Sequence, residues 1–367
     1  MLDTTTWLQL GAGFALLFAG GEGLVRGSSR LARRVGISPL VVGLTVVAFG
    51  TSAPELLVSA TAVLDGRDQI AVGNAVGSNI FNVLVILGLC ALARPLVVAQ
   101  QLVFRDIPVM IACALLLLFF GLDGRVGVLE GLLLCAGVVA FTVDSVRASR
   151  RESAEIHSEY EAALERRAGG RGVLADSGLV AAGLALLVIG ARWLVAGAVA
   201  LAQALGLDDT VIALTIVAAG TSLPEVATSL VATLRGERDI AVGNVVGSCI
   251  FNVLAVVGVS SVLTGRGIAV PTSIENFDLP VMVAVCVACV PILVRGHRIG
   301  RWAGALFLAY YVAYTAYLVL AAREHAALAR FSMIMLEFVV PLTVVTLIAL
   351  ALAAREAPPP AGRGEQV

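Results

Sequence analysis

The sequence contains no lysine, only three histidines and few charged residues of any kind. Charged residues make up 14% of its 367 positions, whereas hydrophobic residues make up 59%, and the mean hydropathy is +0.96. This composition is far more apolar than that of a soluble globular domain. The sequence therefore predicts an all-α integral membrane protein embedded in a lipid bilayer. The balance of 25 basic against 26 acidic residues gives no sign of a nucleic-acid partner.

Motifs of reactive chemistry are also missing. The six cysteines all fall within apolar runs, where free cysteine behaves as a small hydrophobe, so no disulfide framework is expected. Cys286 and Cys289 form a C-x-x-C without a neighbouring histidine or second pair, which argues against a metal or redox role. No H-E-x-x-H and no nucleophile with a matching base occurs in the apolar runs. We therefore expect no enzyme activity, no bound cofactor and no obligate protein partner.

Long apolar runs are what the chain has in abundance. At about 20 residues per crossing, they predict ten spanning helices, near 7–31, 37–64, 70–92, 106–121, 126–146, 177–205, 211–234, 240–263, 278–295 and 300–322. The first run lacks the positive flank of a signal peptide and is expected to remain as a helix. The segment 147–176 is expected to be a linker, 323–353 to contain an eleventh helix, and 354–367 to be a disordered tail.

Arginines predict the orientation, because cytoplasmic loops carry an excess of them. They gather after the first, third, fifth, seventh and ninth predicted helices. The sequence thus predicts a multi-pass protein of a prokaryotic cytoplasmic membrane, with the N-terminus outside and the 147–176 loop in the cytoplasm. Arg323 and Arg330, before the eleventh segment, fit this pattern less well.

An internal repeat organises the chain. The hexapeptide GTSAPE at 50–55 returns as GTSLPE at 220–225, and IAVGN at 70–74 returns as IAVGN at 240–244, at one constant offset. We therefore expect a first five-helix repeat over 1–146 and a second over 177–322. Since each repeat crosses the membrane an odd number of times, the second must have inverted topology, which places a binding site near the midplane between the repeats.

Each hexapeptide places a carboxylate beside a helix break. Pro54 has no N–H, so the carbonyl of Gly50 loses its helical partner, and such backbone is tolerated at membrane depth only where protein, water or an ion satisfies it. Glu55 follows Thr51 by four residues and Ser52 by three, which puts carbonyl, hydroxyl and carboxylate oxygens on one helical face. The second copy repeats this arrangement with Thr221, Ser222 and Glu225.

The next helix in each half carries a polar stripe with a spacing of four residues. The two stripes consist of Asn74, Ser78 and Asn82, and of Asn244, Ser248 and Asn252. Hydroxyl, amide and carboxylate oxygens without thiolate or imidazole suit a hard cation such as Ca²⁺ or Na⁺. Serine, threonine and asparagine also commonly tie membrane helices together. A carboxylate at membrane depth, however, costs about 3 kcal/mol or more and is usually functional, so two of them in equivalent positions favour an ion site.

Two further aspartates occupy equivalent positions in the repeats. Asp106 and Asp278 each precede a proline at the start of a predicted helix. They are interpreted first as helix caps, with a role in ion access as the alternative.

The paired G-T-S-x-P-E and G-N-x-x-G-S-x-I-F-N motifs resemble those of the cation/calcium exchanger superfamily, specifically the prokaryotic sodium/calcium exchangers, from about residue 11 to 322. The resemblance implies that helices two, three, seven and eight enclose the ions, while helices one and six slide across them. It also implies the metal ligands, which are backbone oxygens of Thr51 and Thr221 together with side chains of Ser52, Glu55, Ser78, Asn82, Ser222, Glu225, Ser248 and Asn252. Asparagine at both 82 and 252, where potassium-dependent relatives have aspartate, argues against potassium coupling.

The expected function is secondary-active antiport of Ca²⁺ against Na⁺, with both ions as transported substrates. Two carboxylates are neutralised by one Ca²⁺ or by several Na⁺, whereas an empty site leaves both charges stranded in a low dielectric. A Ca²⁺/H⁺ antiporter with Glu55 and Glu225 as proton carriers is the alternative on the same fold. A membrane scaffold or receptor without transport is a third interpretation, for which the two carboxylates would have no use.

Overall fold

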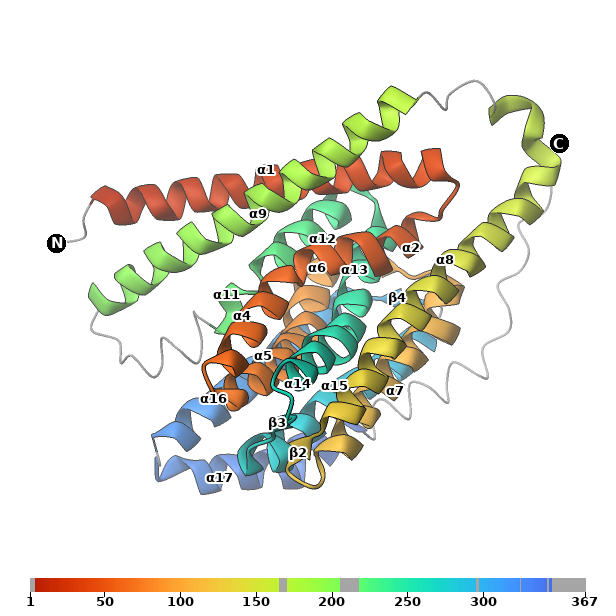
Figure 1. Ribbon diagram of the computed structural model, residues 1–367. Helices are drawn as coiled ribbons and strands as arrows, with labels where there is room; N and C mark the ends of the chain where they lie inside the picture. Colours follow the sequence, from red (N-terminus) through yellow and green to blue (C-terminus); the bar gives the residue numbers. More distant parts are fainter. Residues whose placement is uncertain are drawn as a thin grey trace.

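The computed structural model describes residues 4–164, 170–204, 218–294, 297–323, 325–341 and 343–344 (Figure 1). Helices dominate these residues, and four strands of two residues each are added. The predicted all-α membrane class is confirmed.

The first half of the chain contains α1 (Thr4–Val35), α2 (Pro39–Val42), η1 (Gly43–Val47), α3 (Ala48–Thr51), α4 (Ala53–Leu64), α5 (Asp68–Phe81), η2 (Asn82–Leu87), α6 (Gly88–Ala93), β1 (Leu96–Val97), η3 (Leu102–Asp106), α7 (Ile107–Gly121), β2 (Arg125–Val126) and α8 (Val128–Leu164). Elements labelled η are π-helical turns.

The second half contains α9 (Gly170–Ala204), α11 (Ala218–Gly220), α12 (Leu223–Arg235), α13 (Arg238–Phe251), η5 (Asn252–Val257), α14 (Gly258–Leu263), β3 (Ile268–Ala269), η6 (Ile274–Asp278), α15 (Leu279–Val294), β4 (Arg298–Ile299), α16 (Arg301–Ala322), α17 (Ala327–Ile334) and η7 (Met335–Val339).

Seven described helices are long and apolar enough to cross a membrane, and the bent pair Pro39–Thr51 and Ala53–Leu64 is long and apolar enough when its two helices are taken together. Two further predicted spans correspond to α12, preceded by residues 205–217 outside the described ranges, and to α15, which is 16 residues long. These elements are consistent with ten spanning helices. Within the segment 323–353, helix α17 starts at Ala327. Residues 345–353 and the tail 354–367 lie outside the described part of the chain.

The segment 147–176, which we expected to link the two halves, is mostly helical where the structure describes it. Helix α8 continues to Leu164, and α9 begins at Gly170. Glutamate and alanine are frequent between 151 and 164, and both are strong helix formers. Helix α8 therefore continues beyond its apolar part into the polar residues that follow.

The strand pairs show how the two halves are oriented. β1 pairs with β4, and β2 pairs with β3, so both pairings join the halves. Helix α7 runs from the β1 end to the β2 end, while α15 runs from the β3 end to the β4 end, and the two helices are in contact. These equivalent helices are therefore antiparallel, which is the orientation that inverted repeats require.

Helices α1 and α9 pack along each other at a very short separation (Figure 1). A Cβ placed on Gly13 would lie 2.6 Å from the backbone nitrogen of Leu194, and one on Gly183 would lie 2.6 Å from that of Leu24. Small residues permit such backbone contact between membrane helices. The pair lies against α12 in the second half.

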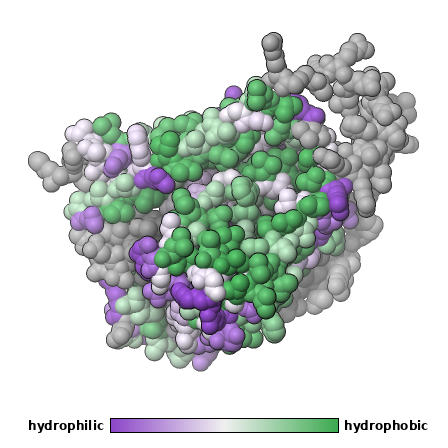
Figure 2. Space-filling view, in the orientation of Figure 1, coloured by the Kyte–Doolittle hydropathy of each residue, from purple (hydrophilic) through white to green (hydrophobic). Residues whose placement is uncertain are grey.

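The outer surface is suited to lipid. The face in Figure 2 is largely hydrophobic, and large apolar side chains such as Phe14, Phe104, Phe119 and Leu129 are exposed. The most apolar stretch of α13 through α14, by contrast, is completely buried. The helices that carry the polar stripes therefore form the interior of the bundle.

Candidate cation site

The second predicted helix is interrupted inside its hexapeptide. α3 ends at Thr51, α4 starts at Ala53, and the helix bends by 42° at this break. Ser52 between them has φ −85° and ψ 4°, and its equivalent Ser222 has φ −88° and ψ 7°. Proline in the first turn of the following helix explains a boundary here, because it cannot donate to the preceding turn. The two motifs thus share one local conformation.

Hydrogen bonds cross between the two motifs. The hydroxyl of Ser52 donates to Glu225 Oε1 at 3.0 Å, and the hydroxyl of Ser222 donates to Glu55 Oε1 at 3.1 Å. All four side chains are buried, and both glutamates have an exposed fraction of 0%. The structure therefore brings both hexapeptides together around two carboxylates, each held by a serine from the opposite half.

The threonines and stripe asparagines make a second reciprocal set. The hydroxyl of Thr51 donates to Asn244 Oδ1 at 3.1 Å, and that of Thr221 donates to Asn74 Oδ1 at 3.4 Å. These bonds use the side-chain hydroxyls, so the backbone oxygens of both threonines are not involved in them.

The two asparagines also fix the helices on which the glutamates lie. Asn74 Nδ2 donates to the backbone oxygen of Glu55 at 3.1 Å and to Ser59 Oγ at 3.0 Å. In the other half, Asn244 Nδ2 donates to Ser229 Oγ at 2.9 Å. Asn74 and Asn244 belong to the predicted stripes but not to the expected ligands, and their contacts assign them a positioning role.

Of the remaining expected ligands, Ser78 is joined to this cluster by a hydrogen bond among the described residues. Ser78 Oγ lies 3.2 Å from Ser222 Oγ, and because the one hydroxyl hydrogen of Ser222 is donated to Glu55, Ser78 is the donor of this bond. Several buried oxygens, by contrast, have no hydrogen-bond partner among the described residues, namely Glu55 Oε2, Glu225 Oε2, Ser248 Oγ, Asn82 Oδ1 and Asn252 Oδ1. Buried polar atoms without partners are rare in native proteins and call for an explanation, of which a bound ion is one.

Asn79 is a residue that the sequence argument missed. Its Oδ1 accepts from Asn252 Nδ2 at 3.1 Å, and its Nδ2 donates to the backbone oxygen of Cys249, also at 3.1 Å. Asn79 and Cys249 occupy equivalent positions in the two repeats, so their direct contact lies near the pseudo-twofold axis. Because cysteine stands at the second position, the pattern of paired polar residues gave no signal there.

A π-helical turn begins at each of two expected ligands, with η2 starting at Asn82 and η5 at Asn252. Such turns appear frequently at functional sites, since they shift side chains and free backbone groups within a helix. Their equivalent positions support the same use of both asparagines.

The aspartates before the prolines differ from each other. Asp278 Oδ1 accepts from the Tyr314 hydroxyl at 2.7 Å, whereas both oxygens of the buried Asp106 lack a partner among the described residues. Asp106 lies at the N-cap position of α7 but makes no capping bond through its side chain within the ranges that the structure covers. The interpretation as a helix cap therefore does not hold for the Asp106 side chain.

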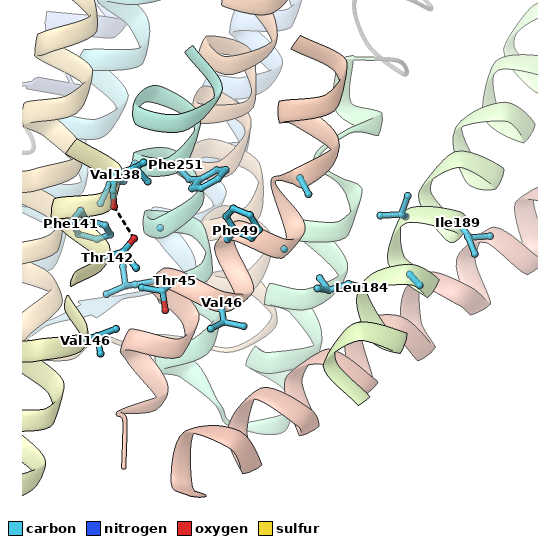
Figure 3. A pocket seen from close by; sticks show the side chains of 17 residues that line it. Thr45, Val46, Phe49, Val138, Phe141, Thr142, Val146, Leu184, Ile189 and Phe251 are labelled. Carbon is cyan, nitrogen blue, oxygen red and sulfur yellow. Dashed lines mark hydrogen bonds between the residues drawn. The ribbon is translucent and has the colours of Figure 1, made fainter. Parts of the chain in front are cut away.

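An apolar cleft of about 820 Å³ lies beside the helix break (Figure 3). Phe49, Val138, Leu184 and Phe251 are among its lining residues. The hydroxyl of Thr142, also in the lining, donates to the backbone of its own helix at 2.8 Å. The cleft therefore offers apolar contacts on this side of the site and is not a hydrophilic ion path.

The donor set distinguishes between metal ions. No group of three or more His, Cys, Asp and Glu side chains suited to a metal occurs among the described residues. The site instead joins two carboxylates with hydroxyl and amide oxygens, the ligands that Ca²⁺ and Na⁺ take in preference to zinc or copper.

Comparisons with known proteins agree with this geometry. The family model described as "Sodium/calcium exchanger protein" matches residues 5–146 and 177–320, and the chain belongs to this family. The two matched ranges coincide with the two halves that contain the repeated motifs.

Individual relatives are similar over nearly their whole length. The sodium/calcium exchanger MaX1 of Methanosarcina acetivorans is 31% identical over 85% of this chain and 97% of its own. The inner membrane protein YrbG of Escherichia coli is 33% identical over 83% of this chain and 94% of its own. A solved structure of the sodium-calcium exchanger NCX_Mj matches with a TM-score of 0.73 and 31% identity, covering 86% of this chain and 99% of that one. The resemblance stated from the motifs is thus confirmed.

Proposed function

We propose that this protein is a secondary-active antiporter that exchanges Ca²⁺ for Na⁺ by alternating access, through one site shared by Glu55 and Glu225. The observation that carries the proposal is the pair of reciprocal bonds, Ser52 to Glu225 and Ser222 to Glu55. They hold two fully buried carboxylates within one cluster of oxygen atoms. Membership of the sodium/calcium exchanger family and similarity to the exchangers MaX1 and NCX_Mj support the choice of ions.

The proposed ligands follow from the cluster. Thr51 and Thr221 contribute backbone oxygens, and the other ligands are side chains of Ser52, Glu55, Ser78, Asn82, Ser222, Glu225, Ser248 and Asn252. Asn74, Asn244 and Asn79 position these groups through the contacts described above.

Charge explains why transport should be exchange. One Ca²⁺ neutralises both carboxylates, and several Na⁺ ions do the same. An empty site leaves two unneutralised charges in an environment that screens them poorly, which costs several kcal/mol per ion. The loaded protein therefore changes its access state more readily than the empty one, and movement of one ion species requires return of the other.

The proposal includes the setting of the site. The chain lies in a prokaryotic cytoplasmic membrane with its N-terminus outside, and the inverted repeats 1–146 and 177–322 enclose the site near the midplane. The ions are substrates, and no cofactor or obligate protein partner is required.

Uptake of radioactive calcium into Na⁺-loaded proteoliposomes tests this function. Wild-type protein is expected to take up Ca²⁺ only with an outward Na⁺ gradient, and Glu55→Gln and Glu225→Gln are expected to abolish uptake. Glu130→Gln is the matched control, because this carboxylate accepts a bond from the Gly127 N–H outside the cluster. Full activity of both site variants would remove the assigned site.

The coupling ion is decided by a second arm of the same assay. Na⁺ is replaced by N-methylglucamine, and a pH gradient is imposed across the vesicles. We expect Ca²⁺ uptake to stop. Uptake that continues under these conditions would establish Ca²⁺/H⁺ exchange instead.

A further inference from the structure

A second large cavity has none of the proposed ion ligands among its lining residues. It has a volume of about 630 Å³ and is enclosed by α15, α16 and the C-terminal segment formed by α17 and η7. Ala284, Ala313, Phe331 and Leu336 are among its mostly apolar lining residues. A volume of this size is typical of pockets that hold a small organic ligand.

Aromatic residues form one wall of the cavity and are held by ring stacking and hydrogen bonds. The rings of Phe277 and Tyr317 stack with centroids 3.9 Å apart. The Tyr314 hydroxyl donates to Asp278, and the Tyr310 hydroxyl donates to Thr343 in the C-terminal segment. Because these hydroxyls are already bonded within the protein, the wall presents its apolar ring surfaces to an occupant.

The surroundings indicate which apolar occupant is available. In the most apolar stretch of α16 only 6% of residues are buried, so this helix lies at the periphery of the bundle, where a membrane protein meets lipid. The C-terminal wall also lies beyond residue 320, where the family match ends. The cavity is thus bordered by acyl chains on the outside and completed by a segment outside the family's common core.

Two exposed arginines, Arg323 and Arg330, lie close in the sequence to the lining residues Tyr317 and Phe331. Arg323 follows the last residue of α16, Arg330 directly precedes Phe331, and both are exposed. Within the described ranges, neither has an ion-pair partner. In the orientation predicted from the other loops, this end of α16 faces the outside of the membrane. Arginine is enriched in cytoplasmic loops, so the predicted orientation does not account for two arginines here. Basic residues beside an apolar pocket are suited to an anionic lipid headgroup.

We propose that this cavity binds an acyl chain of one anionic phospholipid, whose phosphate is held by Arg323 and Arg330. The arginines supply bidentate donors that match phosphate oxygens. Leu84 in the lining lies two residues beyond Asn82, on the helix that carries one of the proposed ion ligands. The lipid chain therefore packs against the same π-helical turn that begins at the ion site.

Native mass spectrometry of the full-length protein tests the proposal. The protein is purified from a mixture of phosphatidylglycerol and phosphatidylcholine in equal amounts. We expect about one phosphatidylglycerol to remain bound per chain, and we expect Ala313→Trp, which fills the cavity, to reduce this retention at least fivefold. Ala305→Trp on the same helix is the control, because Ala305 is exposed and does not line the cavity.

The headgroup is tested with the double variant Arg323→Gln and Arg330→Gln, which we expect to retain the two lipids equally. Arg298→Gln, an exposed arginine before α16, should keep the preference for phosphatidylglycerol. Equal lipid retention by wild type and Ala313→Trp would overturn the proposal. Occupation by a free fatty acid, or a stable dimer in place of bound lipid, would do the same. The assay needs no transport, so its outcome is independent of the exchange function.

Discussion

Replacing either buried glutamate with glutamine should weaken Ca²⁺ binding far more than Na⁺ binding. Both carboxylates have an exposed fraction of 0%, so solvent screens them little. At an effective dielectric constant of about 20, a carboxylate about 4 Å from a monovalent ion contributes about 4 kcal/mol, and twice that for a divalent ion. If the amide oxygen and water recover half of this attraction, the losses are about 4 kcal/mol for Ca²⁺ and about 2 kcal/mol for each Na⁺, or roughly 700-fold and 30-fold in affinity.

The assay compares two exchange modes of the same variant in proteoliposomes. Na⁺/Na⁺ exchange, followed with radioactive sodium, should persist at raised Na⁺ in Glu55→Gln and Glu225→Gln, while Na⁺/Ca²⁺ exchange is lost. The two variants should behave alike, because their bonds to Ser222 and Ser52 have nearly equal lengths of 3.1 and 3.0 Å. An equal fall in both affinities would refute the reasoning from charge, and Glu130→Gln should change neither.

Three further predictions concern the frame around the site. Gly13→Ala should lower the free energy of unfolding in detergent by about 1–3 kcal/mol, because the added Cβ would lie 2.6 Å from the backbone of Leu194. Gly11→Ala is the control, since its Cβ would have nothing within 4 Å. Equal melting temperatures of the two variants would contradict the packing of α1 on α9. Tyr314→Phe should lower the free energy of unfolding by about 1–3 kcal/mol, because it removes the hydrogen bond to Asp278. Tyr317→Phe is the control, because it keeps the ring that stacks on Phe277. Asn244→Ala removes its bonds to Thr51 and Ser229 and should weaken Ca²⁺ binding about tenfold in equilibrium binding measurements; an unchanged affinity would exclude the positioning role.

The meeting of the two hexapeptides could be predicted from the sequence, because helical spacing and duplication act together. A separation of four residues puts Thr51 and Glu55 on one face, and the second copy repeats it. The crossed partnership of Ser52 with Glu225 could not be predicted in this way. It depends on how the two halves dock, and many helix arrangements would bring both motifs to the midplane.

The sequence contains a signal for the close packing of α1 and α9 that polarity and pairing did not capture, but none for the contact made by Asn79. The glycines at 13, 20 and 27 and those at 183, 190 and 197 recur every seven residues, the spacing of one helical face, and α1 and α9 approach each other along them. Asn79 lies within the repeated motif but has Cys249 as its equivalent, so only the fold shows that it contacts Asn252.

The hydrogen bonds that cross between the two halves constrain the substitutions that the chain can accept in evolution. Each carboxylate is oriented by a hydroxyl encoded in the other copy of the repeat, so neither copy is free to lose its serine while the other keeps a working glutamate. Positions such as Asn79 and Cys249, which meet at the axis, can diverge because one pair serves both halves. A substitution at one of these serines therefore alters the surroundings of the carboxylate in the opposite half, whereas the contact of Asn79 with Cys249 occurs once for both halves.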